Sequence, residues 1–338
     1  MKAPMFFHML LYSAAFAYGE SKNVLFLGNS YTAENNLPQM VADMATSAGD
    51  TLLFDSNAMG GATFYAHSIN TVSLSKIMSG NWDYVVLQGQ SLELFGYFTG
   101  IAFPFPAAGV LDSIINQYNP CGETMFYRTW GRKNGLGTYS FQTMDSLIHV
   151  NYMNLADTLN AVVSPVGEVW KYIRQNYPSI ELYQSDESHP SVAGTYATAS
   201  CFYSSIFRKD PTSCTFNSTL SQTDAANIKA TTKTIVFDNL LNWHIGEYDS
   251  LFINCVGIGV PEIENGFGNM YPNPATITIT VEIKNGLKDP IQLYNSKGIL
   301  LKEIETAKQL RINIADLPDG LYFLRQKGES QGKKFIKQ

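Results

Sequence analysis

The chain has 338 residues, of which 45% are hydrophobic, and its formal net charge is −6. About 240 residues before position 260 suffice for one α/β core, and about 80 after it suffice for a small second domain. Residues 18–259 carry 11 Lys and Arg against 20 Asp and Glu. Because nucleic acids and anionic membranes are bound by basic surfaces, we expect no nucleic-acid partner.

The N-terminal segment has the pattern of a secretory signal peptide. Lys2 is followed by an apolar run from Met5 to Phe16, which ends in an Ala15-Phe16-Ala17 cleavage pattern. The run is shorter than the ~20 residues that a membrane span needs, which disfavours an N-terminal anchor. We therefore expect residues 1–17 to be removed on export and the mature chain to have no transmembrane span.

A buried strand is predicted at Asn23 to Leu27, directly before Gly28-Asn29-Ser30. A continuous apolar run of this length is typical of a strand covered on both faces of a parallel sheet. Residues 36–48 have apolar side chains at helical spacing, as the first crossover helix would. Ser30 is thus expected at the carboxyl edge of the sheet, where α/β folds bind ligands. The alternative is a serine that only caps the helix or makes a turn.

A second polar block lies near the end of the same domain, at Asp186-Glu187-Ser188-His189-Pro190-Ser191. An Asp and a His three residues apart can lie in one loop with the carboxylate beside the imidazole. A nucleophilic serine needs a base, and the base needs an orienting group. Of the five histidines, His189 is the one with both a neighbouring acid and a Pro-Ser context. The alternative is a loop histidine without a catalytic role.

Together the two blocks resemble those of the SGNH (GDSL-type) hydrolases, over roughly residues 23–209. The resemblance implies a flavodoxin-like three-layer α/β/α domain with a parallel sheet, which we place at residues 18–259. It also implies that Ser30 is the nucleophile, His189 the general base and Asp186 its orienter.

In that family an oxyanion hole is formed by the N–H of the nucleophile, a glycine N–H and an Asn side chain. The resemblance assigns the first to Ser30 and the second to Gly61, with Gly60 as the alternative. The family has Gly-x-Asn after the third strand, whereas this chain has Gln-Gly-Gln after the predicted strand 82–87. Gln90 falls on the asparagine position, and Gln88 is the alternative. An amide donor of this kind is worth ~2.7–4 kcal/mol.

Similar glutamine-containing blocks occur in sialate and carbohydrate acetylesterases. The resemblance therefore implies a secreted serine esterase whose substrate is an acylated carbohydrate or another ester, with acetyl or other short acyl groups. Alternatives are a lipase or thioesterase for longer acyl chains, and an inactive glycan-binding protein on the same scaffold. The mechanism requires no cofactor, and the cysteines and histidines lack the spacing of metal ligands.

Three further residues are candidates for the substrate cleft. Tyr97 lies in an aromatic segment, residues 94–106, that follows the glutamine block and lacks clean periodicity. Aromatic rings suit the apolar faces of sugars, although the same residues can pack locally. Arg128 and Trp130 follow the predicted fourth strand to the same sheet edge, where either can line the site or be structural.

Export permits disulfides, and four cysteines allow three ways of forming two bridges. Cys201 lies in an apolar helical stretch and is expected to be buried. Cys214 and Cys255 lie in a loop-rich region and are the pair that we expect.

Residues 260–338 differ in pattern from the first part. Alternating residues in 276–283, 291–294 and 320–324 predict a small antiparallel β-sandwich. Three landmarks, Met-Tyr-Pro-Asn-Pro at 270–274, Leu-Pro-Asp-Gly-Leu-Tyr-Phe at 317–323 and a basic tail, resemble the C-terminal sorting domain of the type IX secretion system. The alternative is a carbohydrate-binding sandwich.

This second resemblance implies a Gram-negative, Bacteroidetes-like source and the type IX secretion machinery as a partner. It also implies a mature protein that is secreted or attached to the outer-membrane surface.

Overall fold

The computed structural model describes residues 19–97, 104–249, 267–283, 289–295, 299–305, 307, 309–327 and 332–337. The chain divides into two compact units, Met1–Val256 and Gly257–Gln338. The predicted signal peptide, residues 1–17, lies outside the described residues. Residues 250–266 also lie outside the described residues, so the expected domain boundary between residues 259 and 260 remains a prediction.

The first unit is built on a five-stranded parallel sheet in the order β2-β1-β3-β4-β5. Its strands are β1 (Ser21–Gly28), β2 (Thr51–Ala58), β3 (Tyr84–Leu87), β4 (Glu123–Tyr127) and β5 (Val162–Ser164). This is the flavodoxin-like order, in which successive strands are added to one side of β1 and then to the other, and this change of side leaves a crevice at the carboxyl ends of β1 and β3. The predicted fold class is therefore confirmed.

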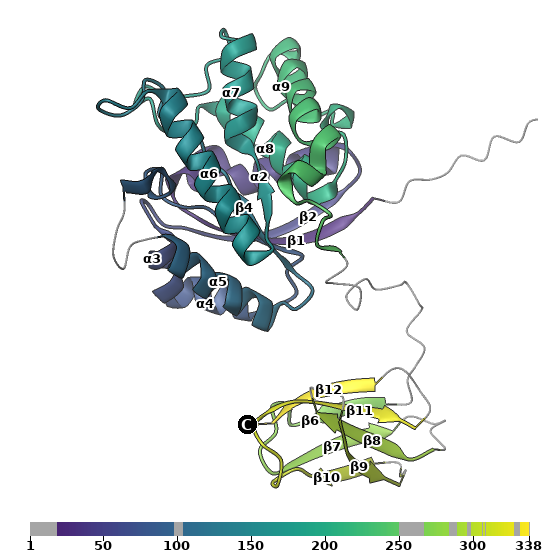
Figure 1. Cartoon of the computed structure of the whole chain (residues 1–338). Coiled ribbons are helices and arrows are strands. Elements are labelled where there is room, and N and C mark those ends of the chain that lie inside the picture. The colour runs from purple at the N-terminus through teal and green to yellow at the C-terminus, as the bar shows by residue number, and fades with distance from the viewer. Residues whose placement is uncertain are drawn as a thin grey trace, which may run out of the picture. The chain divides into compact units, whose positions relative to one another are not determined.

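Helices cover both faces of this sheet (Figure 1). They are α1 (Ser30–Ala33), α2 (Leu37–Ser47), α3 (Phe64–Ile69), α4 (Thr71–Met78), α5 (Pro104–Tyr118), α6 (Phe141–Leu159), α7 (Val166–Asn176), α8 (Val192–Phe207) and α9 (Gln222–Ile235). Helices α3, α4 and α5 pack together on one side, and α2, α7, α8 and α9 group on the other. The crossovers thus bury the sheet between two helical layers.

Strand β1 is the centre of the core, as its apolar run predicts. Val24, Leu25 and Phe26 are fully buried, and β1 pairs with β2 on one side and β3 on the other. Full burial of such a side chain stabilises the fold by about 1.5–3 kcal/mol. This strand carries the chain to Gly28, after which the polar residues begin.

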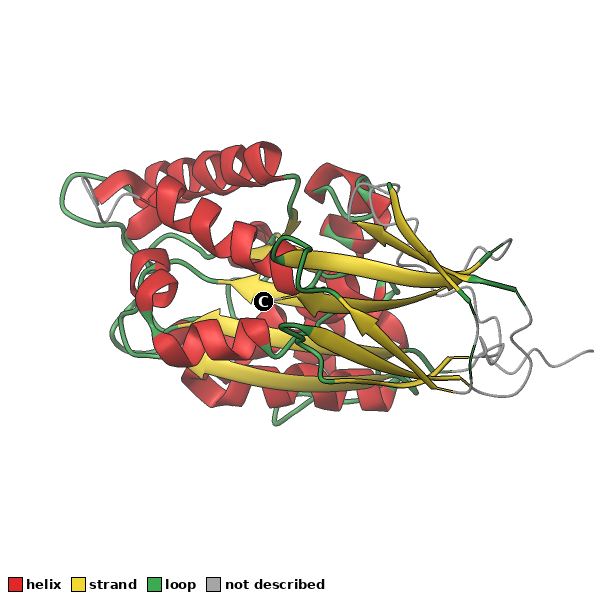
Figure 2. Ribbon diagram, turned by 90° about the horizontal axis from the view of Figure 1, so that it is seen from below, coloured by secondary structure: helices red, strands yellow, loops and turns green. Residues whose placement is uncertain are grey.

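The second unit consists of two antiparallel sheets, in the orders β10-β7-β6 and β12-β11-β8-β9. Figure 2 shows that its described elements are strands and loops, whereas the helices belong to the first unit. The strands are β6 (Phe267–Tyr271), β7 (Thr278–Ile283), β8 (Ile291–Asn295), β9 (Leu300–Ile304), β10 (Gln309–Asn313), β11 (Gly320–Gln326) and β12 (Gly332–Lys337). In β7, Ile279 and Val281 point into a shared core while alternate residues face outward. The predicted antiparallel architecture is confirmed.

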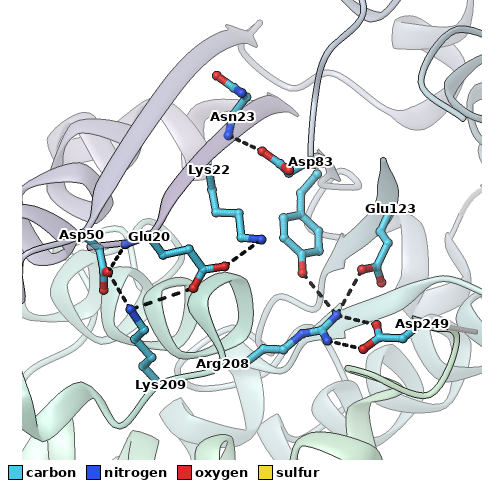
Figure 3. Close-up of polar contacts among 10 residues, drawn as sticks. Glu20, Lys22, Asn23, Asp50, Asp83, Glu123, Arg208, Lys209 and Asp249 are labelled. Carbon is cyan, nitrogen blue, oxygen red and sulfur yellow. Dashed lines mark hydrogen bonds and ion pairs between the residues drawn. The ribbon is translucent and has the colours of Figure 1, made fainter. Parts of the chain in front are cut away.

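The amino-terminal edge of the parallel sheet carries an ion-pair network, opposite the edge where Ser30 lies. Arg208, just after α8, contacts both oxygens of Asp249, at 2.6 and 2.8 Å, and also Glu123 at 3.2 Å (Figure 3). Lys209 lies 2.6 Å from the buried Asp50. Through Arg208, Asp249, the last described residue of the first unit, is linked to the amino-terminal edge of the sheet.

The expected Cys214–Cys255 bridge is wrong, because Cys214 is a free, buried thiol. Its backbone carbonyl accepts a hydrogen bond from the Lys229 ammonium, and burial raises the pKa of its thiol to about 11. Cys201 is also free and buried, as expected, whereas Cys121 is disulfide-bonded. Cys255 lies outside the described residues.

Within the part of the chain that the structure describes, no helix combines the length and apolar character needed to cross a bilayer.

Cysteine mapping tests whether Cys214 is a free thiol rather than the partner of Cys255. When the protein is unfolded without reductant and treated with iodoacetamide, we expect peptides with Cys201 and Cys214 to be alkylated. The Cys121 peptide should react only after reduction, which serves as the internal control. An unreactive Cys214 under these conditions would contradict the structure.

Candidate active site

Ser30 is the first residue of α1 and is separated from the end of β1 by Asn29 alone. The side chain of Asn29 caps this helix by accepting a hydrogen bond from the Tyr31 N–H at 3.1 Å. The turn places the Ser30 hydroxyl at the carboxyl edge of the sheet, half-buried rather than enclosed. The serine is therefore not itself the capping residue; Asn29 has that role.

The structure brings Ser30, His189 and Asp186 into one hydrogen-bonded chain. His189 Nε2 lies 2.8 Å from Ser30 Oγ, and His189 Nδ1 is hydrogen-bonded to Asp186 Oδ2. A carboxylate on one ring nitrogen leaves the other available to accept the serine proton. The arrangement can therefore activate Ser30 as a nucleophile.

The loop around Asp186 is held in shape by hydrogen bonds within the loop itself. Asp186 Oδ1 accepts the backbone N–H groups of Ser188 at 3.1 Å and His189 at 2.9 Å. Partial burial opposes ionisation of Asp186, but the hydrogen bonds from His189 and these N–H groups outweigh it and lower its pKa to about 2. Asp186 is therefore ionised at neutral pH, as an orienter of His189 must be.

A stack of three aromatic rings supports this loop from behind. The Trp130 ring lies parallel to Trp170, with centroids 3.6 Å apart, and to Tyr31 at 4.8 Å. Trp130 Nε1 donates to the Ser188 carbonyl at 3.1 Å, and the Tyr31 hydroxyl lies 2.6 Å from Ser188 Oγ. The stack thus ties the loop of His189 to the residue after Ser30.

Gly60 and Gly61 lie in a tight turn after β2. The Ala62 N–H donates to the Met59 carbonyl at 3.0 Å, and Gly61 has a φ of +70°. A non-glycine residue is strained at this φ, which accounts for the glycine. Asn29 Nδ2 donates to the Ala62 carbonyl at 3.0 Å, so the turn is held beside the Ser30 loop.

Gln88 is fully buried and all its polar groups are used by the fold. Its Oε1 accepts from the Asn29 N–H at 3.0 Å and from the Thr32 hydroxyl at 2.8 Å. Its Nε2 donates to Asn29 Oδ1 at 2.8 Å and to the Gly89 carbonyl at 2.7 Å. An amide with both protons committed has none left for an oxyanion, which disfavours Gln88 as the donor.

Gln90 is half-buried and has a different arrangement. Its Oε1 accepts from the Leu92 N–H at 2.7 Å, and its backbone N–H donates to Glu93 at 2.8 Å. Its Nε2 has no hydrogen-bond partner among the described residues. The amide protons of Gln90 are therefore free to meet a ligand.

Of the other three cleft candidates, Arg128 and Trp130 are buried. Arg128 is fully buried, with Nη2 2.9 Å from Asp145, and lines a separate cavity of about 550 Å³ to which the three residues of the chain Ser30–His189–Asp186 do not contribute. Trp130 is buried in the aromatic stack, so its role there is support. The side chain of Tyr97 lies outside the described residues.

Four supporting residues are not marked as such by any sequence motif: Asn29, Tyr31, Ser188 and Glu93. Asn29 and Tyr31 flank Ser30, and their proximity was the available signal. Ser188 and Glu93 act through long-range contacts that no local pattern reveals. Among the described residues, no cluster of three or more His, Cys, Asp or Glu side chains is arranged to hold a metal ion.

Comparison with solved structures supports the fold of the first unit. A DUF4886 family protein from Bacteroides uniformis has a TM-score of 0.54 at 14% identity, over 65% of this chain and 95% of that one. A candidate SGNH hydrolase from Slackia heliotrinireducens has a TM-score of 0.46 at 21% identity, over 55% and 99%. An acetyl xylan esterase from Geobacillus stearothermophilus has 0.40 at 14%, over 55% and 94%. At these identities the first similarity shows a shared fold.

No curated protein matches the sequence. Residues 269–338 match the family described as the secretion system C-terminal sorting domain. The first landmark, 270–274, begins in the last residues of β6, the second, 317–323, runs into β11, and the basic tail lies in β12. These residues thus carry a type IX secretion sorting domain, which indicates that the protein is secreted or attached to the cell surface.

Proposed function

We propose that the protein is a secreted serine esterase that removes acetyl or other short acyl groups from carbohydrates. The observation that carries this proposal is the hydrogen-bonded chain from Ser30 through His189 to Asp186 at the carboxyl end of β1. Because the protein is exported, the esters available to these three residues are extracellular and polymeric ones rather than cytosolic metabolites.

In the first step His189 Nε2 takes the proton of Ser30 Oγ, which attacks the carbonyl carbon of the ester. The carbonyl oxygen becomes an oxyanion, held by the N–H groups of Ser30 and Gly61 and by Nε2 of Gln90. The bond from carbon to the leaving oxygen then breaks, and His189 gives its proton to that oxygen. The products are a free alcohol and an acyl group on Ser30.

In the second step a water molecule attacks the acyl carbon while His189 takes its proton. The same donors hold the second oxyanion, and Ser30 leaves with the proton from His189. The acid is released and the enzyme returns to its starting state. Asp186 stays ionised throughout and stabilises the imidazolium that forms twice.

Several observations support a carbohydrate substrate with a short acyl group. The glutamine block resembles that of carbohydrate acetylesterases, and Gln90 keeps free amide protons at the place of the family's asparagine. The protein is also exported, so glycan esters outside the cell are within its reach.

Replacing Ser30 tests the nucleophile. We expect the wild type to react with a fluorophosphonate probe and to hydrolyse p-nitrophenyl acetate faster than the octanoate. Ser30→Ala should lose labelling entirely and turnover by several orders of magnitude, because a triad serine acts as a unit with its base.

The control is Ser191→Ala, which removes a serine near His189 that caps α8 through the Gly194 N–H and is not in the proposed triad. It should still label. A folded wild type that never labels would refute the esterase and favour a glycan-binding protein, and a preference for octanoate would favour a lipase or thioesterase.

Gln90→Glu separates the oxyanion donor from its structural role. Glutamate keeps an oxygen for the Leu92 N–H but loses the amide donor and adds a negative charge. We expect kcat for p-nitrophenyl acetate to fall about 10²–10³-fold, as loss of one oxyanion donor does, with the thermal midpoint little changed. An unchanged kcat would exclude Gln90 from the oxyanion hole.

Gln88→Leu, in contrast, should lower the stability of the protein rather than only its kcat. Leucine leaves the buried Asn29 amide and the Thr32 hydroxyl without partners, and each unsatisfied group costs about 1–3 kcal/mol. We expect the free energy of unfolding, measured with urea, to fall by at least about 2 kcal/mol. A stable Gln88→Leu variant that lost only kcat would instead assign the donor to Gln88.

A further inference from the structure

Glu93 is a fully buried carboxylate at the start of the short helical segment η2 (Glu93–Tyr97). One of its oxygens, Oε2, lies 2.8 Å from the backbone N of Gln90. The backbone N of Phe64 lies 3.1 and 3.2 Å from its two oxygens. One side chain thus joins the loop after β3 to the loop after β2.

The two N–H groups belong to the two proposed oxyanion loops. Phe64 is the first residue of α3, three positions after Gly61, and its N–H is one of those that a helix cannot satisfy internally. Gln90 is the proposed amide donor, and its Nε2 has no hydrogen-bond partner among the described residues. The distance between the Gly61 turn and Gln90 is therefore set by a carboxylate that contacts both loops.

Among the described residues, Glu93 forms no ion pair with a cation. Its carboxylate interacts electrostatically with the buried hydroxyl of Tyr152 on α6, which accepts the Gly89 N–H at 3.1 Å. Burial raises the pKa of Glu93 to about 7, although the hydrogen bonds from Gln90 and Phe64 oppose the rise.

We propose that Glu93 is a positioning residue for the oxyanion hole, whose carboxylate fixes the Gly61 turn and the Gln90 loop relative to each other. This inference rests on the proposed esterase function. Glu93 does not touch the substrate; it acts through the backbone groups that it holds.

Protonation weakens this tie. An ionised carboxylate accepts N–H groups on both oxygens, whereas a protonated one turns an oxygen into a hydroxyl that must itself donate. As the pH falls through about 7, Glu93 takes up a proton and the tie between the loops loosens. Full activity therefore requires an ionised Glu93 that holds the two loops, in addition to His189 as the base.

The first test compares pH profiles of Glu93→Gln and wild type on p-nitrophenyl acetate. For the wild type we expect log(kcat/KM) to approach a slope of 2 on the acid side, and for Glu93→Gln a slope of 1. At pH 8 the variant should lose about 10- to 100-fold in kcat with KM little changed, because small misplacements of catalytic groups have effects of this size.

Asp112→Asn is the matched control. Asp112 is also a buried carboxylate with a raised pKa, but its partners are Thr124 at 2.7 Å and Asn116 at 2.9 Å on and beside α5. It touches neither oxyanion loop. Its replacement should leave the slope of 2 and kcat unchanged, whatever it does to stability.

The second test does not depend on activity or on a variant that folds. Hydrogen exchange of the wild type at pH 6 and pH 8, corrected for the intrinsic effect of pH, should show less protection of the Phe64 and Gln90 amides at pH 6. The Thr124 region serves as the reference.

The outcomes separate the two proposals. A wild type without esterase activity would refute the proposed function, while the exchange data would still decide whether Glu93 ties the loops. An active wild type with a slope of 1, or with equal protection at both pH values, would overturn the role of Glu93 alone.

Discussion

The amide-to-amide contact between Asn29 and Gln88 is the interaction on which the site depends. Buried polar groups at strand ends must find partners, and these two side chains supply them to each other and to the loops after β1, β2 and β3. Because β1 and β3 are parallel neighbours, their carboxyl ends lie at the same edge of the sheet, close enough for one amide to bridge them. The three loops that border the crevice are therefore linked to one another by hydrogen bonds.

The proposed triad combines a local contact, between Asp186 and His189, with a long-range contact between His189 and Ser30. Asp186 and His189 are ordered by their own loop, so their mutual orientation needs little from the rest of the fold. The approach of His189 to Ser30 is different, because 159 positions separate them. That approach is maintained by Tyr31 and Trp130, which both contact Ser188. The buried aromatic stack therefore matters for geometry even though none of its rings belongs to the hydrogen-bonded chain.

The features that were predictable from the sequence have local signals. The apolar run before Ser30, the Asp-x-x-His spacing and the alternation around Ile279 each encode a strand or a turn. Cysteine pairing was not predictable, because spacing says nothing of which thiols a helix buries, and Cys214 is buried. Arg128 was placed at the sheet edge correctly, but its buried partner Asp145 turns it away from the site. The choice between Gln88 and Gln90 needed hydrogen-bond partners that only the fold reveals.

The tie made by Glu93 has a thermodynamic consequence that distinguishes it from ordinary packing. Its pKa is about 7 in the folded protein against 4.5 for an unburied glutamate. Between these values the unfolded chain is ionised while the folded chain holds the proton, so stability falls as the pH rises from about 4.5 to about 7. At one pKa unit per 1.4 kcal/mol, the ionised form costs about 3 kcal/mol of stability above pH 7. The proposed oxyanion hole is therefore best ordered in the pH range where Glu93 stabilises the fold least, which is the relation expected of a buried charge retained for function rather than for stability.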